Sequence, residues 1–482
     1  MTTQKSLFLA VLCLVVFISG CDESLTDVNS NPNSPTDVDP NIILPYATES
    51  AVDLYQGAAV GMEFGNLIVQ HWARIQGTDK DRYIYSNSSF SSFWEGGYSG
   101  PLMDFQRIQK LGEEQGNPNY QAVGMIMKAW YFSLLTDSFG DIPYSEALQG
   151  IDGGVTQPAF DRQEVIYTNL LQQLETASSM IVTNDHEISG DILYSGDMSK
   201  WQKFANSLRF RLLMRISGKE NVSSKLASLV QNDNMFDSNE DNAQLVYLSN
   251  PPNRHPIIEL PSGRRNQFRV SKTLVDRLKQ LNDPRLEVYA DTTQYTSATK
   301  PQDSLYVGVP NGLMPEDAAK LGMDRTSKIG SAFRKAETPG VIMTYAELNF
   351  LMAEAAEKGF ISGSVESYYE KGIRASFDQH GVTGVDSYLS EAEVDFDPAN
   401  ALQQIGEQKW IALYGQGLEA WNDWKRTGFP DLEPSIANDN DDQIPVRMEY
   451  PFSAQITNQQ NYDEAISRQG ENSINTHVWW DE

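Results

Sequence analysis

Cysteine is almost absent from this chain, since only Cys13 and Cys21 occur among its 482 residues. If the first twenty residues are removed, a single cysteine remains, which excludes a disulfide framework and a free thiol nucleophile. Stability must then come from a buried apolar core. The chain is long enough for roughly two or three domains, or for one large helical domain.

Positive charge is scarce as well. The chain has 37 Lys and Arg against 65 Asp and Glu, which gives a formal net charge of −28. Binding to nucleic acid or to anionic lipid requires a basic face, so this balance argues against both partners. The acidic excess indicates a well-solvated surface and does not identify a substrate.

Short catalytic motifs are missing too. The chain has no Gly-x-Ser-x-Gly, no His-Glu-x-x-His, no phosphate-binding Gly-Lys-Ser/Thr loop and no Gly-x-Gly-x-x-Gly. Its five histidines are far apart, and the Asp-rich run at 438–442 lacks the Gly and Glu of an EF-hand loop. We therefore expect no catalytic residue, no cofactor and no metal site. A carboxylate-pair hydrolase, which no motif would reveal, stays open as an alternative.

The N-terminus has the order of a bacterial signal peptide: Lys5, an apolar run from Leu7 to Ile18, and small residues before Cys21. Twelve apolar residues extend only about 18 Å as a helix, against about 30 Å of hydrocarbon, which is too short for a membrane span. A cysteine directly after small residues is what a lipoprotein-processing peptidase requires. We predict a signal peptide over 1–20 and a lipid on Cys21.

Composition divides the rest of the chain. Residues 21–40 are rich in Asn, Pro and Asp, which predicts a flexible tether. Helical periodicity then predicts one mainly α domain over 41–482. The pattern breaks down at about 238–335, where we expect a loop-rich insertion with short helices at most, of the kind that often carries a binding surface. Residues 431–480 are expected to form loops and short turns.

Several helices are predicted from apolar spacing. Asp161 and Glu164 resemble a capping box that opens a helix extending to about residue 181. Two further helices, over about 345–359 and 365–381, are separated by five residues and should form an antiparallel hairpin. Small residues facing bulky ones in this pair follow the packing of tetratricopeptide-type repeats.

Aromatic residues are concentrated between residues 71 and 98, beside charged and amide side chains. Flat apolar faces next to hydrogen-bonding groups suit a sugar ring, and they suit a protein interface equally well. Trp94 and Tyr98, four residues apart, are expected in the core. The candidate ligand-binding residues, including two from the irregular region, are Trp72, Arg74, Tyr83, Tyr85, Arg264 and Phe268.

Blocks spread along the whole chain match one family. They include residues 136–148 (TDSFGDIPYSEAL), 282–286 (NDPRL), 408–414 (QKWIALY), 421–428 (WNDWKRTG) and 478–481 (VWWD). In this combination and order the chain resembles the SusD/RagB-type nutrient-binding outer-membrane lipoproteins, and in particular the SusD-like branch that ends in Trp-Trp.

The resemblance implies a mainly α fold with four tetratricopeptide-like hairpins that support a loop-rich ligand-binding face. It also implies a lipid anchor in the outer membrane of a Gram-negative cell, facing the exterior, and Asp22 and Glu23 resemble a surface-export signal. The implied partner is a SusC-like TonB-dependent barrel. The lipoprotein would close over this barrel as a lid and pass on an oligosaccharide or peptide.

The family's ligand residues vary with the substrate, so the six candidates rest on composition and position alone. Two other functions stay open: a surface glycosidase or peptidase, and a gate for the barrel without ligand specificity of its own. The helical hairpins are expected to face the barrel, with the irregular region contributing to ligand capture.

Replacing Cys21 by alanine should leave folding and ligand binding intact and abolish nutrient uptake, because the protein would no longer be held at the membrane. Labelled palmitate, membrane fractionation and growth on the nutrient measure these effects. Cys13→Ala is the matched control, since Cys13 lies in the segment predicted to be removed. Normal uptake by the Cys21→Ala variant would contradict the lid interpretation.

Overall fold

Consecutive helices pair along the chain. The computed structural model describes residues 38–150, 153–232, 234–293 and 305–481, so Cys21, the predicted signal peptide and most of the predicted tether lie outside the described residues. The paired helices are α6 (Pro101–Glu114) with α7 (Pro118–Phe139), α8 (Gln163–Met180) with α9 (Met198–Arg215), α16 (Tyr345–Glu357) with α17 (Val365–Gln379), and α19 (Ala401–Ala412) with α20 (Gly417–Thr427).

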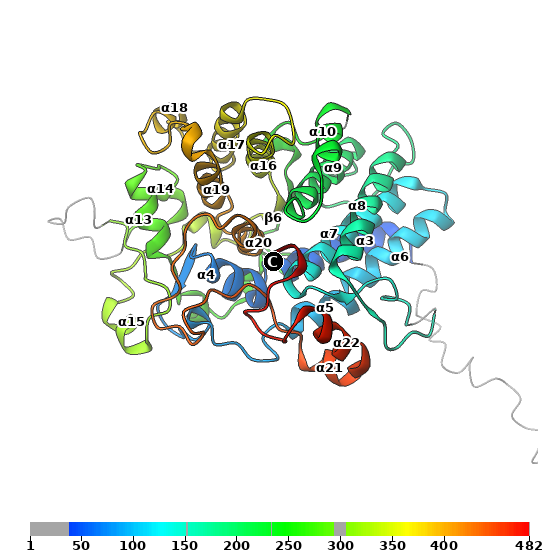
Figure 1. Ribbon diagram of the computed structural model, residues 1–482, viewed down its shortest axis with the longest axis horizontal. Helices are drawn as coiled ribbons and strands as arrows, with labels where there is room; N and C mark the ends of the chain where they lie inside the picture. The colour runs from blue at the N-terminus through cyan, green and yellow to red at the C-terminus, as the bar shows by residue number, and fades with distance from the viewer. Residues whose placement is uncertain (1–37, 151–152, 233, 294–304, 482) are drawn as a thin grey trace, which may run out of the picture. The chain divides into compact units, whose positions relative to one another are not determined.

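These hairpins stack side by side. Contacts run from α17 to α16, then to α9, α8, α7 and α6, and α3 (Pro40–Gln56) covers α6. In Figure 1 the same order can be followed from the top of the view to its right side. The stack confirms the mainly α, tetratricopeptide-like fold, and residues from Pro40 onward form one compact unit. Within the described residues, no helix is both long and apolar enough to cross a bilayer.

Local signals explain where several of these helices begin and end. The side chain of Asn117 accepts hydrogen bonds from the N–H groups of Asn119 and Tyr120 and so caps α7, and Asp197 caps α9 in the same way. Gly359 has a φ of +70°, a conformation that favours glycine, just after α16 ends. The predicted hairpin over 345–381 is confirmed at its predicted place.

The capping box predicted at Asp161 and Glu164 is wrong, although the helix is correct. The Asp161 carboxylate accepts hydrogen bonds from the N–H groups of Tyr144, at 3.2 Å, and Ser145, at 2.7 Å, and makes no bond to the first turn of α8. The reason is tertiary: Asp161 belongs to a strand that pairs with residues 142–143. Its oxygens are therefore held by another segment.

Short antiparallel strand pairs fasten the loops to the helices. β1 (Trp72–Arg74) pairs with β5 (Phe268–Val270), β2 (Ile142–Pro143) with β3 (Phe160–Asp161), and β4 (Ala243–Leu245) with β6 (Gly340–Met343). The paired residues lie between 17 and 198 positions apart in the chain. The strands thus connect loops that the helical stack alone would leave separate.

The irregular region over 238–335 contains short helices and strands. The longest helix among its described residues has nine residues. Its elements are η3 (Asn239–Asp241), α11 (Pro256–Glu259), α12 (Ser262–Arg265), α13 (Lys272–Gln280), α14 (Leu286–Tyr289), α15 (Pro315–Leu321) and η5 (Ser331–Phe333), together with β4 and β5. The prediction for 431–480 is wrong in part, because an eleven-residue helix, α22 (Gln459–Gln469), follows α21 (Phe452–Thr457) there. Only Ala465 of α22 is buried, so its apolar pattern is too weak to read from sequence.

The remaining elements fill in around this framework. They are the π-helix η1 (Ala58–Gly65), α4 (Asn66–Ile68), the 3-10 turn η2 (Lys80–Arg82), α5 (Ser91–Ser99), α10 (Ser223–Asn232), α18 (Val385–Leu389), η6 (Pro398–Asn400) and η7 (Trp479–Asp481). One continuous apolar core runs through the unit, with Trp130, Trp201 and Trp421 fully buried in it.

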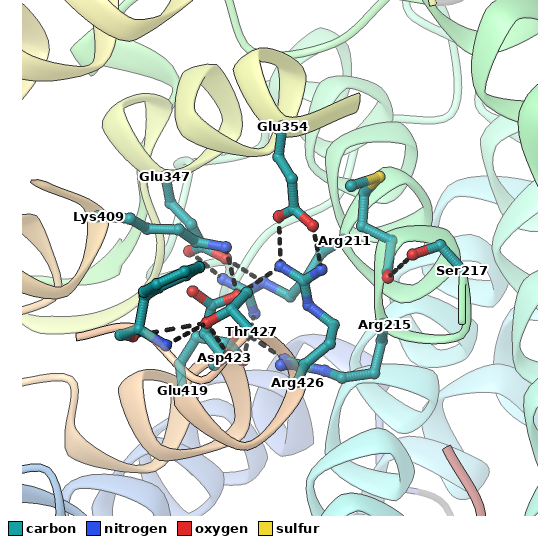
Figure 2. A network of polar contacts seen from close by, with 12 residues as sticks. Arg211, Arg215, Ser217, Glu347, Glu354, Lys409, Glu419, Asp423, Arg426 and Thr427 are labelled. Atoms are coloured by element: carbon teal, nitrogen blue, oxygen red, sulfur yellow. Dashed lines mark hydrogen bonds and ion pairs between the residues drawn. The ribbon is translucent and has the colours of Figure 1, made fainter. Parts of the chain in front are cut away.

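Buried charges cross this core. Arg211 and Arg215 of α9 are both almost completely buried. Arg211 Nη2 lies 2.5 Å from Glu347 Oε2 of α16, and Arg215 Nη2 lies 2.5 Å from Glu419 Oε1 of α20. Figure 2 shows these side chains converging from three helices. The charges tie together segments that lie more than 100 residues apart.

A second part of the network joins α16, α19 and α20. Arg426 contacts Glu354 at 2.5 Å and Asp423 at 2.9 Å, and Lys409 contacts Asp423 at 2.7 Å (Figure 2). Burial by itself would raise the pKa of Glu354, but the Arg426 guanidinium outweighs it and lowers that pKa to about 2. These carboxylates are therefore ionised at neutral pH, and each has its cation.

Replacing Arg211 by methionine should lower the free energy of unfolding by about 3–5 kcal/mol, because Glu347 would be left buried without its cation. Urea unfolding followed by circular dichroism measures the loss. Arg209→Met on the same helix is the matched control, since Arg209 contacts Glu175, whose side chain is 62% exposed. That variant should lose less than about 1 kcal/mol. Equal losses of unfolding free energy in the two variants would contradict the idea that breaking the buried pair costs more than breaking the exposed one.

Candidate functional site

The pairing of β1 with β5 brings together two groups of predicted ligand residues. Arg74 lies opposite Phe268 in the register, and its guanidinium carbon is 4.5 Å from the centroid of the Phe268 ring. The ring of Trp72 lies 5.6 Å from the same phenylalanine. Candidates from the aromatic region and from the irregular region, nearly 200 residues apart in the chain, therefore meet at one place.

Four of the six candidates lie beneath the surface at this place. Trp72, Arg74, Tyr83 and Phe268 are between 2% and 5% exposed. The Arg74 guanidinium donates to Glu63 at 3.1 Å, and the Tyr83 hydroxyl accepts from the Ser435 N–H at 3.0 Å. Arg74 thus holds Glu63 from the buried side, and the role of these four side chains in contacting a ligand stays a prediction.

Tyr85 and Arg264, the other two candidates, line a cavity of about 380 Å³. We call it the Tyr85 pocket. It lies at the junction of α3, η1, η2 and α5, and its lining residues are Asp53, Leu54, Gly57, Ala58, Ala59, Glu63, Lys80, Tyr85, Ser89, Ser92 and Arg264.

Two guanidinium groups share one carboxylate at the base of the Tyr85 pocket. Arg264 donates to both oxygens of Glu63, with Nε at 2.8 Å from Oε1 and Nη2 at 2.6 Å from Oε2. Arg74 donates to Oε1 from the buried side. The cluster therefore carries one net positive charge, and the Arg264 side chain stays 44% exposed beside the cavity.

An aromatic ring and an ammonium group form one wall of the pocket. Lys80 Nζ lies 4.9 Å from the centroid of the Tyr85 ring and donates to Ser89 Oγ at 2.8 Å. Burial lowers the pKa of Lys80. The ring itself is held by Phe64 and Phe90, each with its centroid 5.4 Å away. The wall thus combines a rigid aromatic group with a hydrogen-bond donor.

Asp53 supplies an acidic group to the lining of the Tyr85 pocket. Burial raises its pKa to about 6, although the Tyr247 hydroxyl, which donates to Oδ1 at 2.5 Å, acts in the other direction. The charge of the pocket therefore changes in the mildly acidic pH range.

Sequence reasoning missed Glu63 and Asp53. A signal for Glu63 did exist, because it is the only charged residue in the segment Ala58–Gly65 (AAVGMEFG), and a carboxylate inside such an apolar helix needs a cation. The sequence could not say which arginine would supply that cation. Asp53, by contrast, lies at an ordinary position of an amphipathic helix and gives no signal.

A larger groove of about 780 Å³ lies elsewhere, with Trp94, Tyr98, Met103 and Phe160 in its lining. Trp94 is buried and packs on Phe139, which confirms its expected core position, and Tyr98 is half-buried beside it. Among the described residues, no three His, Cys, Asp or Glu side chains gather as metal ligands would.

Comparisons with known proteins point to one family. The family model named SusD-like, described as starch-binding and associating with the outer membrane, matches residues 32–451. A solved chitin-binding protein is 28% identical, with a TM-score of 0.82 over 92% of this chain and 100% of its own. A SusD homologue from Bacteroides fragilis is 29% identical, with a TM-score of 0.79 over the same shares.

A third solved structure, a chitin-binding SusD homologue from Flavobacterium johnsoniae, is 26% identical, with a TM-score of 0.77 over 92% of this chain and 97% of its own. In sequence, no curated protein matches this chain.

Replacing Asp53 by asparagine tests the charge of the Tyr85 pocket. Because the folded-state pKa is raised to about 6, the stability that the carboxyl group contributes is present at low pH and is lost as the pH rises through that value. The variant, which cannot ionise, should therefore gain free energy of unfolding relative to the wild type between about pH 4 and pH 7. Urea unfolding at several pH values measures the difference.

Asp317→Asn, at a half-exposed position of α15, is the control for this measurement and should show a much smaller change with pH. If the difference in unfolding free energy between Asp53→Asn and the wild type did not change with pH, Asp53 would not be desolvated in the folded protein.

Proposed function

Because the chain belongs to the SusD-like family of starch-binding proteins that associate with the outer membrane, we propose that it captures an oligosaccharide at the bacterial surface for import. The observation that carries this proposal is the Tyr85 pocket, where one aromatic ring lies beside several hydrogen-bonding side chains. Two of the similar structures are named chitin-binding, which favours a glycan over a peptide as the ligand.

The chemistry of the pocket suits a sugar ring. A pyranose has an apolar face, which can lie against the Tyr85 ring, and a rim of hydroxyls that donate and accept hydrogen bonds. Lys80, Ser89 and Arg264 offer donors, and Asp53 offers an acceptor. Glu63 neutralises one of the two guanidinium charges beside it, so the cluster at the base of the pocket keeps one positive charge.

The way the carboxylates of the Tyr85 pocket are held supports binding rather than hydrolysis. A glycosidase needs one carboxyl group as acid and another as base or nucleophile. Glu63 is held by two arginines and Asp53 by Tyr247, so both already have partners. We propose that the protein carries out no covalent chemistry on its ligand.

Delivery would depend on the lipid at Cys21 and on the tether after it. More than one acyl chain is needed for stable anchoring. A flexible tether keeps the folded domain at a high effective concentration near one place on the membrane, where a partner can lie. We propose that this place is a SusC-like TonB-dependent barrel, over which the protein closes as a lid with its helical hairpins facing the barrel. Weak binding suffices, because a tightly held ligand could not be passed on.

Replacing Lys80 by methionine should weaken glycan binding about tenfold, or by about 1.4 kcal/mol, because a charged donor at the pocket wall is lost. Isothermal titration with chitin and starch oligosaccharides measures this effect. Tyr85→Leu should cause a similar loss, whereas Tyr85→Phe should bind nearly as well, since its hydroxyl donates to the carbonyl of Lys80 within the chain.

Lys320→Met, at an exposed position on α15, is the control and should bind like the wild type. Wild-type protein that binds peptides and no glycan would contradict the proposed ligand class, and release of shortened glycan would indicate a hydrolase. Binding of neither ligand would favour a gate without specificity of its own.

A further inference from the structure

A second cavity lies apart from the Tyr85 pocket and shares no lining residue with it. Its volume is about 470 Å³, within the range of about 300–1,000 Å³ that is usual for small-molecule sites. The end of α17, the turns η3 and η5, the strand pair β4–β6 and the loop between α19 and α20 surround it. We call it the Gln416 pocket.

Buried polar atoms without partners are concentrated at this cavity. Gln416 is 3% exposed, and its Oε1 has no hydrogen-bond partner within the described part of the chain. Gln379 Oε1, His380 Nε2 and Asn239 Oδ1 are likewise buried atoms without a hydrogen-bond partner in this part of the chain, and their residues also line the pocket. Since buried polar groups are normally satisfied, these atoms point to something that is bound there.

The amide of Asn239 shows what kind of group is required. Its nitrogen donates to the carbonyl of Ala375 and to Asp378 Oδ2, both at 2.9 Å. These two bonds determine which end of the amide is oxygen, so the free atom is an acceptor. An occupant must therefore offer a donor at this point, such as a hydroxyl or an amine.

Aromatic side chains form a fixed wall of the same pocket. The rings of Phe333 and Tyr414 meet edge to face with centroids 4.8 Å apart, and Tyr414 stacks on Tyr289 at 4.3 Å. The Tyr414 hydroxyl donates to the carbonyl of Tyr289 at 2.8 Å, which holds the ring in place. The wall is thus ready before any ligand arrives.

The charge of the lining limits which ligands the Gln416 pocket can bind. Among the described residues that line the Gln416 pocket, Glu240 and Asp378 are acidic and none is basic. Burial lowers the pKa of His380 to about 4, so its ring is neutral at neutral pH. The lining therefore repels anions and accepts neutral or cationic groups.

From these observations we infer that the Gln416 pocket is a second binding site, separate from the Tyr85 pocket, for a neutral or amino sugar unit. The sugar places its hydroxyl or amine donors on Gln416, Gln379 and Asn239 and lies against the aromatic wall of Phe333 and Tyr414. A smaller hollow of about 30 Å³ shares Phe333, Tyr414 and Gln416 and also touches Trp72. It has room for little more than a water molecule.

Three probes of equal size and different charge test this site: glucosamine, glucose and glucuronate. Histidine labelled with ¹³C at the ring reports binding directly, because His380 lines the pocket and the His380→Gln variant identifies its signal. We expect a saturable shift of the His380 signal with glucosamine and glucose, and at least tenfold weaker binding of glucuronate. No saturable shift with any probe would overturn the inference, as would a crystal soaked in glucosamine with only ordered water in the pocket.

Variants separate this site from the first. Gln416→Met removes the buried acceptor at nearly constant volume and should weaken the response at His380 at least tenfold. If urea titration shows that the Gln416→Met variant is not stably folded, Gln379→Met, at the end of α17, gives a second test. Gln202→Met, a half-buried glutamine on α9, is the matched control.

Lys80→Met should leave the response at His380 unchanged, even if it weakens binding at the Tyr85 pocket. A loss at His380 in the Lys80→Met variant would show that the two pockets are not independent sites and would overturn the inference. If the Tyr85 pocket binds no glycan, the proposed function fails, but a saturable shift of the His380 signal would still support the Gln416 pocket as a binding site.

Discussion

The pairing of buried charges between α9, α16 and α20 is the constraint on which the rest of the structure depends. Arg211 and Arg215 lie in the apolar core, where an unpaired charge would be prohibitively costly, and Glu347 and Glu419 meet them there. Such pairs add little net stability compared with well-packed apolar residues. They penalise any other arrangement of the helices, because every alternative leaves a charge without its partner.

The same network helps to position the Gln416 pocket and the chain end. Glu419 belongs to α20, whose preceding loop carries Tyr414 and Gln416 into the second pocket. At the C-terminus, the Trp480 indole donates to Asp137 Oδ1 at 2.9 Å. Lys425 lies 3.7 Å and 4.6 Å from the ring centroids of Trp421 and Trp480. The stacked helices therefore support the loops and short strand pairs that surround the Gln416 pocket.

The two pockets differ in how far the sequence could predict them. The first contains Tyr85 and Arg264, which stand out because aromatic and cationic residues in irregular segments are uncommon in a pure scaffold. The second consists of amides and rings from distant segments, such as Asn239 and Phe333, and each of these residues looks ordinary in its local context. What distinguishes the amides is that one oxygen of each, such as Asn239 Oδ1, has no hydrogen-bond partner within the described part of the chain, which is a property of the folded molecule.

The sequence by itself determined the mainly α fold, the hairpin over 345–381 and the membership of the family. These features depend on the local spacing of apolar residues and on short sequence motifs. Such signals can be recognised without knowing which residues are in contact. Only the tertiary structure decided that Asp161 serves a strand pair instead of a helix cap, that Arg74 supports the first pocket from below, and that Arg211 finds Glu347. Each of these outcomes depends on a partner more than ten residues away, and in two cases more than a hundred, which the local pattern of a chain cannot specify.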